Sequence, residues 1–318
     1  MPETASSSTG SPSTGSPGSP STGWTSAGWR AEAVAWLDAA LAARGARRTG
    51  EVEQPRVRPW ATVLTAPTTA GRVWLKASGQ DTAFEAGLYL VLREVAAEWV
   101  LDPIGVDAER GWVLLPDGGP SLGAVDGLAD ALVRYARLQR RLFPHVDRLL
   151  AAGVSDMRPA AMPQRLEQAV SAVRGELPGA FTDGTAAALV ADWSAELAAS
   201  SLPPSLDHND LHPENVLLSG RFYDWGDSVV AHPFAAALHP LGVIRAELGD
   251  TAADTARDRY LAEFADHATP AALRAELALA CRLGIVARTL TWARAAGTGP
   301  SDFADAPRLT LLALLERR

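Results

Sequence analysis

The sequence predicts an α+β protein of two lobes. The smaller N-terminal lobe is expected to carry an antiparallel sheet and one helix, and the larger C-terminal lobe is expected to be mainly helical. Two observations lead to this prediction. Between residues 52 and 115 the apolar residues fall in short alternating or β-branched runs, which are typical of strands. Beyond the turn at residues 116–120 they recur at helical spacing almost to the end of the chain.

The N-terminal end of the chain has a composition of its own. Residues 1–28 predict a disordered tail, because Ser, Thr, Gly and Pro dominate the segment and leave too little apolar surface for a core. A leading helix is expected from residue 29 to about residue 44. We therefore divide the folded part into an N-terminal lobe over residues 29–116 and a helical C-terminal lobe over residues 117–318.

The rest of the N-terminal lobe is expected to hold the sheet and its helix. The strands are expected at residues 52–57, 60–65, 72–77, 104–106 and 112–115, and the helix at residues 82–98. The loop of residues 66–71 predicts an antiparallel hairpin between the second and third strands. Pro55 confines the first strand to a sheet edge or a bulge, because proline has no N–H for a ladder hydrogen bond.

The C-terminal lobe shows one helical face after another. These faces run through residues 121–142, 164–174, 184–199, 232–248, 251–266, 270–296 and 306–316. The segment from residue 206 to residue 232 is the exception. Two short apolar runs there, at residues 216–218 and 221–223, flank a Ser-Gly pair and predict a second small hairpin.

Composition excludes several classes of site and partner. The 318 residues have a formal net charge of −8, which argues against binding nucleic acid through a basic surface. Cys281 is the only cysteine, so the chain forms no intramolecular disulfide and no cysteine-built metal site. We recognise no signal peptide and no membrane-spanning segment, and therefore expect a cytoplasmic protein without a membrane partner.

Lysine occurs once in the chain, at Lys76, whereas arginine occurs 28 times. A single lysine against that background indicates a place where arginine does not serve. Lys76 lies near the end of the expected strand over residues 72–77, and Glu85 lies in the helix that follows. A strand lysine held by a helix glutamate is the arrangement that presents an ammonium group to ATP phosphates in kinases.

The strongest local motif is the run His-Asn-Asp-Leu-His-Pro-Glu-Asn over residues 208–215. Asp210 and Asn215 have the spacing of the protein-kinase catalytic loop. In such a loop the aspartate orients an attacking hydroxyl group, and the asparagine oxygen binds magnesium without adding charge. Asp224 follows in an Asp-Trp-Gly run, where a carboxylate can complete the magnesium site.

With these motifs the sequence resembles the aminoglycoside phosphotransferase and choline kinase-like family, small-molecule kinases with a two-lobed, protein-kinase-like fold. The resemblance covers roughly residues 50–315 and depends mainly on residues 206–216 and 223–228. It implies ATP and Mg²⁺ as cofactors. The residues that it assigns are Asp210 as catalytic base, Asn215 and Asp224 as magnesium ligands, Lys76 and Glu85 as the phosphate-anchoring pair, and Leu115 and Asp117 in a hinge that meets adenine.

The sequence also departs from the family's pattern. Asn209 stands where the phosphotransferase branch commonly has glycine, although asparagine also tolerates a left-handed backbone. The loop of residues 65–71 contains no GxGxxG run, and His212 stands where protein kinases place a lysine. No Ala-Pro-Glu run or long activation segment follows Asp224, which argues against a protein substrate.

Several alternatives remain open from the sequence. His208, Asp210 and His212 form a His-x-Asp-x-His run, which a metal-dependent hydrolase also uses. A nucleotide-binding pseudokinase is the other alternative. Asp227 either meets the substrate or catalytic loop, or caps a helix beginning near His232. The acidic residues between positions 247 and 266 form either a solvated helix face or a wall for a cationic acceptor.

The sequence therefore predicts an ATP-dependent phosphotransferase that acts on a hydroxyl group of a small molecule. An aminoglycoside-like antibiotic or a metabolite is the expected acceptor class, and the helical lobe contains no motif that identifies the acceptor further.

Overall fold

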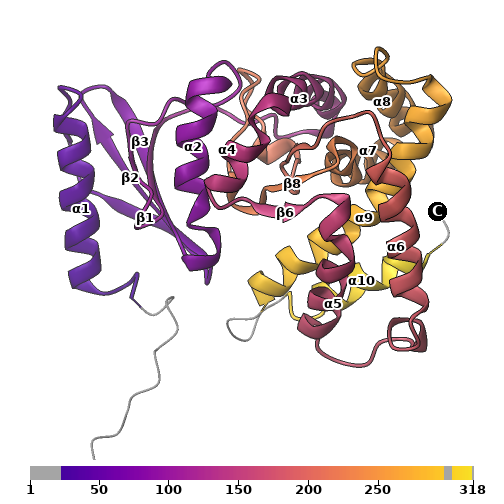
Figure 1. Ribbon diagram of the computed structural model, residues 1–318. Helices are drawn as coiled ribbons and strands as arrows, with labels where there is room; N and C mark the ends of the chain where they lie inside the picture. Colours follow the sequence, from indigo (N-terminus) through magenta and orange to yellow (C-terminus); the bar gives the residue numbers. More distant parts are fainter. Residues whose placement is uncertain (1–22, 297–302, 317–318) are drawn as a thin grey trace, which may run out of the picture.

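The computed structural model describes residues 23–296 and 303–316 of the chain and has the two expected lobes (Figure 1). The N-terminal lobe is a five-stranded antiparallel sheet with strand order β1-β2-β3-β5-β4. Its strands are β1 (Glu53–Val57), β2 (Ala61–Thr68), β3 (Gly71–Ser78), β4 (Gly105–Asp107) and β5 (Trp112–Pro116). The sheet lies between two helices, α1 (Ala27–Ala42) and α2 (Phe84–Val95), and α2 faces the C-terminal lobe (Figure 1).

The start of the lobe differs from the expectation for the tail. Helix α1 begins at Ala27, the side chain of Ser26 caps it by accepting a hydrogen bond from the Trp29 N–H, and Trp24 is buried. Residues 23–28 thus belong to the folded lobe. The remainder of the expected tail, residues 1–22, lies outside the described residues.

The β2–β3 hairpin is longer than the sequence suggested. The strands pair from Ala61 with Ser78 as far as Thr68 with Gly71, so the turn consists of two residues instead of the expected loop over 66–71. Gly71 has a φ of 103°, a conformation that glycine adopts without a Cβ penalty. Strand β1, which contains Pro55, is an edge strand with an irregular register, as predicted.

Alternation along β3 determines which of its residues face the C-terminal lobe. Leu75 and its neighbours at alternate positions pack against Leu37 and Leu41 of α1 in a small core. Lys76 therefore points to the opposite face, toward α2 and the C-terminal lobe, because successive side chains of a strand project to opposite sides.

The C-terminal lobe is built from helices around one large core. Its α-helices are α3 (Leu128–Leu142), α4 (Val146–Ala151), α5 (Met162–Ala172), α6 (Thr185–Ala198), α7 (Leu238–Leu248), α8 (Asp250–Ala262), α9 (Pro270–Ala296) and α10 (Ala306–Leu312). Two begin later than expected: α3 follows a 3₁₀ turn at Val125–Gly127, and α7 follows one at Pro233–Ala237. Helix α4 is too short for its periodicity to have indicated it.

A second sheet was not expected from the sequence. Its strands β6 (Ser155–Met157), β7 (Ser205–Asp207) and β8 (Val229–Ala231) have the order β6-β8-β7, and β6 runs parallel to β8. Three-residue strands are too short to show an alternating pattern. The predicted hairpin near residue 220 is reduced to a single bridge between Val216 and Phe222. The small sheet fixes the start of the loop over residues 208–215, which directly follows β7.

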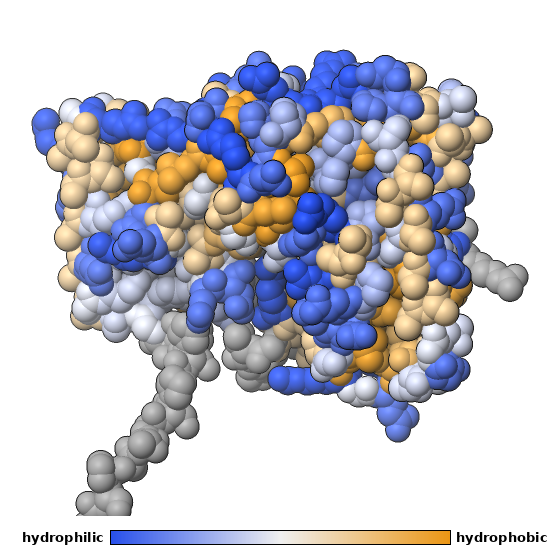
Figure 2. Space-filling model, viewed as in Figure 1, coloured by the Kyte–Doolittle hydropathy of each residue, from blue (hydrophilic) through white to orange (hydrophobic). Residues whose placement is uncertain are grey.

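Hydrophobic residues are interspersed with hydrophilic ones on the face shown in Figure 2. Among the helices within residues 23–296 and 303–316, none combines the length and the apolar character that crossing a bilayer requires.

Candidate active site

Lys76 joins the two lobes through two carboxylates. Its Nζ lies 2.6 Å from Glu85 Oε2 on α2 and 2.5 Å from Asp224 Oδ1 of the C-terminal lobe. Burial alone would lower the pKa of Lys76, but Asp224 and Glu85 raise it above its ordinary value. The lysine is therefore a fixed positive charge between the lobes, paired with Glu85 as expected and also with Asp224, which the sequence did not indicate.

Glu85 holds this arrangement in place from the first turn of α2. Only 2% of Glu85 is exposed, so its carboxylate needs partners. Besides Lys76, it accepts hydrogen bonds from Ser78 Oγ at 3.2 Å and from the Trp225 N–H at 3.0 Å. The glutamate thus connects β3 to the backbone that directly follows Asp224.

The catalytic loop begins where β7 ends, and a tight backbone conformation shapes it. Asn209 has a φ of 60°, the left-handed conformation that its amide side chain was expected to tolerate. Its N–H donates to Asp207 Oδ1 at 2.7 Å, and its side-chain amide donates to the Asp227 carbonyl at 3.2 Å. Burial raises the pKa of Asp207 to about 7.

Asp210 lies in the centre of a ring of positively charged and imidazole groups. Its Oδ1 lies 3.2 Å from Arg288 Nη2 and 3.7 Å from His239 Nε2, and its Oδ2 lies 3.3 Å from His212 Nε2. Burial would raise the pKa of Asp210, but the hydrogen bond of His212 and the charge of Arg288 hold it well below its ordinary range. Asp210 is therefore ionised at neutral pH.

The amide nitrogen of Asn215 fixes the orientation of its side chain. Its Nδ2 donates to the Asp210 carbonyl at 2.9 Å, lies 3.1 Å from His212 Nε2 and reaches Asp210 Oδ2 at 3.4 Å. Since the amide nitrogen makes these contacts, the amide oxygen, Oδ1, points away from them. None of the side-chain hydrogen bonds among the described residues uses that oxygen.

Asp224 is held by its backbone as well as by Lys76. It has a φ of 63°, a conformation that is uncommon for a residue with a Cβ and marks an imposed geometry. The buried His208 ring fixes the preceding peptide, with Nε2 3.0 Å from the Tyr223 carbonyl, and packs against Trp225. Burial opposes ionisation of Asp224, but Lys76 lowers its pKa.

The chain passes from one lobe to the other at the end of β5 (Trp112–Pro116), where the sequence predicted the hinge. Leu115 pairs with β3, and the Asp117 N–H donates to the Arg72 carbonyl at 3.0 Å. Backbone groups of an antiparallel ladder alternate in direction, so those of Leu115 and Asp117 face β3. The Pro116 carbonyl, between them, faces the opposite edge. The Asp117 side chain accepts a hydrogen bond from the Gly119 N–H.

Comparison with known proteins gives the family. The sequence profile of the phosphotransferase enzyme family matches residues 105–279, which is more than half of the chain. The chain belongs to this family. It is a small-molecule kinase, a phosphotransferase with a hydroxyl group as acceptor. No curated protein sequence matches it.

Solved structures show the same fold for this phosphotransferase at low sequence identity. A Plasmodium vivax ethanolamine kinase has a TM-score of 0.61 at 9% identity, covering 83% of this chain and 82% of its own. A macrolide 2′-phosphotransferase of type I has a TM-score of 0.60 at 18% identity, covering 90% and 98%. A choline/ethanolamine kinase family protein from Mesorhizobium loti has a TM-score of 0.57 at 21% identity, covering 89% and 95%.

The hydrolase alternative lacks its ligands in this phosphotransferase. The His208 ring is fully buried and turned to a backbone carbonyl, so it does not share a metal site with Asp210 and His212. Within the part of the chain that the structure describes, no group of three or more His, Cys, Asp or Glu side chains is placed to hold a metal ion.

The contacts of Asp227 show which of its two expected positions it occupies. Asp227 contacts the catalytic loop, since its carbonyl accepts from Asn209, and its carboxylate lies 3.2 Å from Arg294 Nη2. It caps no helix near residue 232, because the His232 ring itself accepts from the Phe234 N–H there. Burial raises the pKa of Asp227 to about 6, against the effect of Arg294.

The acidic residues between positions 247 and 266 form a surface of ion pairs. Most of them pair with arginines of neighbouring helices or of the same helix, among them Asp258 with Arg274 at 3.0 Å and Asp266 with Arg140 at 2.6 Å. These pairs favour a solvated, charge-balanced face over a wall for a cationic acceptor.

Sequence reasoning missed the residues that surround Asp210 from α7 and α9. His239 lies on α7, and Arg288, Thr291 and Arg294 lie along α9. Arg288 also donates to the Asn209 carbonyl, and Thr291 accepts from the Asn209 side chain at 2.9 Å. The spacing of Arg288, Thr291 and Arg294 by one helical turn is the only signal of a shared face.

Proposed function

We propose that the protein transfers the γ-phosphoryl group of ATP to a hydroxyl group of a small-molecule antibiotic or metabolite. One observation carries the proposal above the others. Lys76 bridges Glu85 and Asp224 across the lobes, at 2.6 and 2.5 Å, beside a catalytic loop whose Asp210 is ionised. This is the set with which kinases position phosphates and an attacking hydroxyl group.

Asp210 is proposed as the group that orients the acceptor hydroxyl and receives its proton. The ring of Arg288, His239 and His212 holds its two oxygens in fixed directions. A carboxylate with a low pKa is a weak base in the ground state, so positioning is its main contribution before transfer. As the bond between the acceptor oxygen and the γ-phosphorus forms and the bond from that phosphorus to ADP breaks, the acceptor hydroxyl becomes acidic and its proton passes to Asp210.

Lys76 is proposed to contact the ATP phosphates. A fixed ammonium group, buried and neutralised by two carboxylates, reorganises little when a phosphate replaces one of its contacts. Glu85 remains its partner, since it is anchored independently by Ser78 and Trp225.

The donors present fit magnesium. Asn215 directs its amide oxygen away from its own hydrogen bonds, and Asp224 uses Oδ1 for Lys76, which leaves Oδ2 as a second hard oxygen donor. Bound there, magnesium would neutralise charge on the transferring phosphates. The chain's contribution is to hold Asp224 in its left-handed conformation and Asn215 in its hydrogen-bonded orientation.

The hinge prediction is refined by the backbone direction. Because the N–H of Asp117 is already used by Arg72, we propose that adenine meets the Pro116 carbonyl and the Gly118 N–H. Leu115 would then contribute its side chain to the wall of the nucleotide site. It is 9% exposed and packs in the large core.

The proposal is tested by magnesium-dependent ADP release across a panel of hydroxyl acceptors, with Asp210→Asn as the comparison. We expect the substitution to lower kcat by roughly 100- to 10,000-fold, because it removes the proton acceptor. Binding of MgATP, measured by titration calorimetry, should persist in the variant. Unchanged turnover in Asp210→Asn would contradict the role of Asp210, and MgATP binding without transfer to any acceptor would favour the pseudokinase.

A further inference from the structure

A cavity of about 180 Å³ opens next to the catalytic loop, between β6, β8, α5 and α9. Its apolar part is formed by Met157, Val229, Ala287 and Leu290. This volume is below the range of about 300–1,000 Å³ that encloses a whole drug-sized ligand. The cavity therefore holds a small molecule, or one ring of a larger one.

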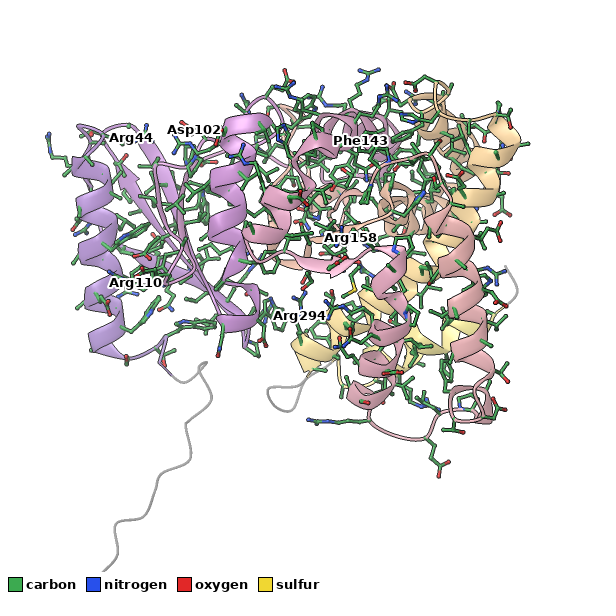
Figure 3. All side chains as sticks on the ribbon, viewed as in Figure 1. Arg44, Asp102, Arg110, Phe143, Arg158 and Arg294 are labelled. Carbon is green, nitrogen blue, oxygen red and sulfur yellow. The ribbon has the colours of Figure 1, made fainter. Side chains whose placement is uncertain are left out.

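The wall on α9 connects this cavity directly to the reacting groups. Thr291 and Arg294 line it, and both also contact the segments that carry the chemistry. Thr291 Oγ1 accepts from the Asn209 side chain at 2.9 Å, next to Asp210, and Arg294 lies 3.2 Å from Asp227. In Figure 3, Arg294 lies on α9 at the side that faces the N-terminal lobe. The side chain of Thr291 thus joins the cavity to Asn209 of the catalytic loop.

The charges around the cavity have one sign. Its lining includes the arginines Arg165 and Arg294 and contains no Asp or Glu. The charge of Arg294 is balanced by Asp227, which lies outside the lining. Arg165, in contrast, has no carboxylate within ion-pair distance among the residues that the structure describes.

Within the described part of the chain, Arg165 has no ion pair because the neighbouring carboxylate, that of Asp156, is already paired with another arginine. Asp156 is paired with Arg158, whose Nε and Nη2 reach its two oxygens at 2.9 and 2.7 Å. Arg158 lies by β6 and the start of α5 (Figure 3). Arg165 donates only to uncharged oxygens, the Asp156 carbonyl at 2.9 Å and Gln168 Oε1 at 2.8 Å. Its Nη2 makes none of the hydrogen bonds found among the described residues.

From these observations we infer that the cavity receives the acceptor through an anionic group, a carboxylate bound by Arg165, with an apolar body against Met157 and Leu290. A guanidinium group offers a carboxylate paired N–H donors, and the apolar surroundings strengthen that contact. A cationic acceptor would meet the guanidinium group of Arg165 in the cavity and no carboxylate in its lining. The inference rests on the proposed function, because it takes the cavity to be the acceptor side of the kinase site.

The test compares two probes of one shape and opposite charge. Para-(hydroxymethyl)benzoate and para-(hydroxymethyl)benzylamine each combine an aromatic ring, a hydroxyl group and one charged group. Their binding to the full chain is measured by titration calorimetry in the presence of MgADP. We expect the benzoate to bind at least about tenfold more tightly than the benzylamine, as hydrogen bonds to charged groups typically contribute.

Variants assign that preference to Arg165. Arg165→Met keeps the apolar length of the side chain and should remove the tenfold preference, and Arg165→Glu should reverse it. Arg174→Met is the matched control, since Arg174 is exposed just beyond the end of α5 and does not line the cavity. The control should bind both probes as the natural chain does, and a thermal melt verifies that each variant folds.

The outcomes separate the inference from the proposed function. Equal binding of the two probes, no measurable binding of the benzoate, or an unchanged preference in Arg165→Met would overturn the inference, even if the protein phosphorylates other acceptors. If MgATP does not bind but the benzoate binds in an Arg165-dependent way without nucleotide, the anion site stands and the proposed function fails.

Discussion

The two sides of the catalytic loop balance their charges differently. On the nucleotide side, Lys76 lies between Glu85 and Asp224, and each charge has a partner within 2.6 Å. On the acceptor side, Arg165 borders a cavity without a carboxylate. On the nucleotide side each of these charges thus has a partner of opposite sign within the chain, whereas the charge of Arg165 has none in the part of the chain that the structure describes. In the function proposed above, the first arrangement binds one cofactor and the second selects among acceptors.

The largest effect on stability is expected when the ion pairs of Lys76 on the nucleotide side are removed. In Lys76→Met, Glu85 keeps its buried position but loses its counter-charge, and Asp224 becomes its uncompensated neighbour. Breaking a buried ion pair typically costs about 3–5 kcal/mol, and we expect the lower end because the lysine is 19% exposed. Urea unfolding measures the loss, and the KM for ATP should rise with it.

A double substitution separates lost charge balance from lost packing. Lys76→Met combined with Glu85→Gln removes the unpaired carboxylate, so it should recover part of the stability without recovering ATP binding. If Lys76→Met unfolds at the same urea concentration as the natural chain, the cluster contributes nothing to stability and the description of a preorganised nucleotide side fails.

The sequence indicated the residues of the nucleotide side but not those of the acceptor side. The kinase-like motifs record the spacings of the residues Lys76, Glu85, Asp210, Asn215 and Asp224. They do so because one cofactor imposes one geometry on these residues. No sequence motif marks the residues on the acceptor side. Its residues come from segments far apart in the chain, and only the three-dimensional packing of β6, α5 and α9 brings them together.

The fold shows a similar division. Long periodic elements such as α9 (Pro270–Ala296) were predicted with their observed bounds, since many residues contribute to the pattern. The three-residue strands of the second sheet were not, because pairing with distant partners, and no local preference, defines them. The residues around Asp210 from α7 and α9 were missed for the same reason.

An intermediate effect, on kcat, is expected from Arg288, which contacts Asp210 between the nucleotide side and the acceptor side. Arg288→Met removes the contact at 3.2 Å and the donor to the Asn209 carbonyl, so the aspartate loses its fixed direction. Misplacement of a reacting group costs up to roughly 100-fold, and we expect kcat to fall about 10- to 100-fold with the KM for ATP unchanged. Steady-state kinetics measure both.

The pH profile distinguishes positioning from simple loss of structure. The pKa of Asp210 is held well below its ordinary range, so the natural enzyme keeps this group ionised in mildly acidic solution. Without the charge of Arg288 that pKa rises, and the acid limb of kcat should move to higher pH. Arg282→Met is the control, because Arg282 lies on the same helix over the Trp193 ring. An unshifted acid limb in Arg288→Met would rule out the electrostatic part of this role.

The smallest effect is expected far from both sides, at the paired acidic surface. Asp254 is 53% exposed and lies 2.8 Å from Arg257, in a pair of the kind that contributes little to stability. Asp254→Asn should change the free energy of unfolding by less than about 0.5 kcal/mol and leave the KM of every acceptor unchanged. Urea unfolding and steady-state kinetics with cationic and anionic acceptors measure the two quantities. A several-fold higher KM for cationic acceptors alone would mean that this face recruits them, and selection by charge would then no longer belong to the cavity beside Arg165.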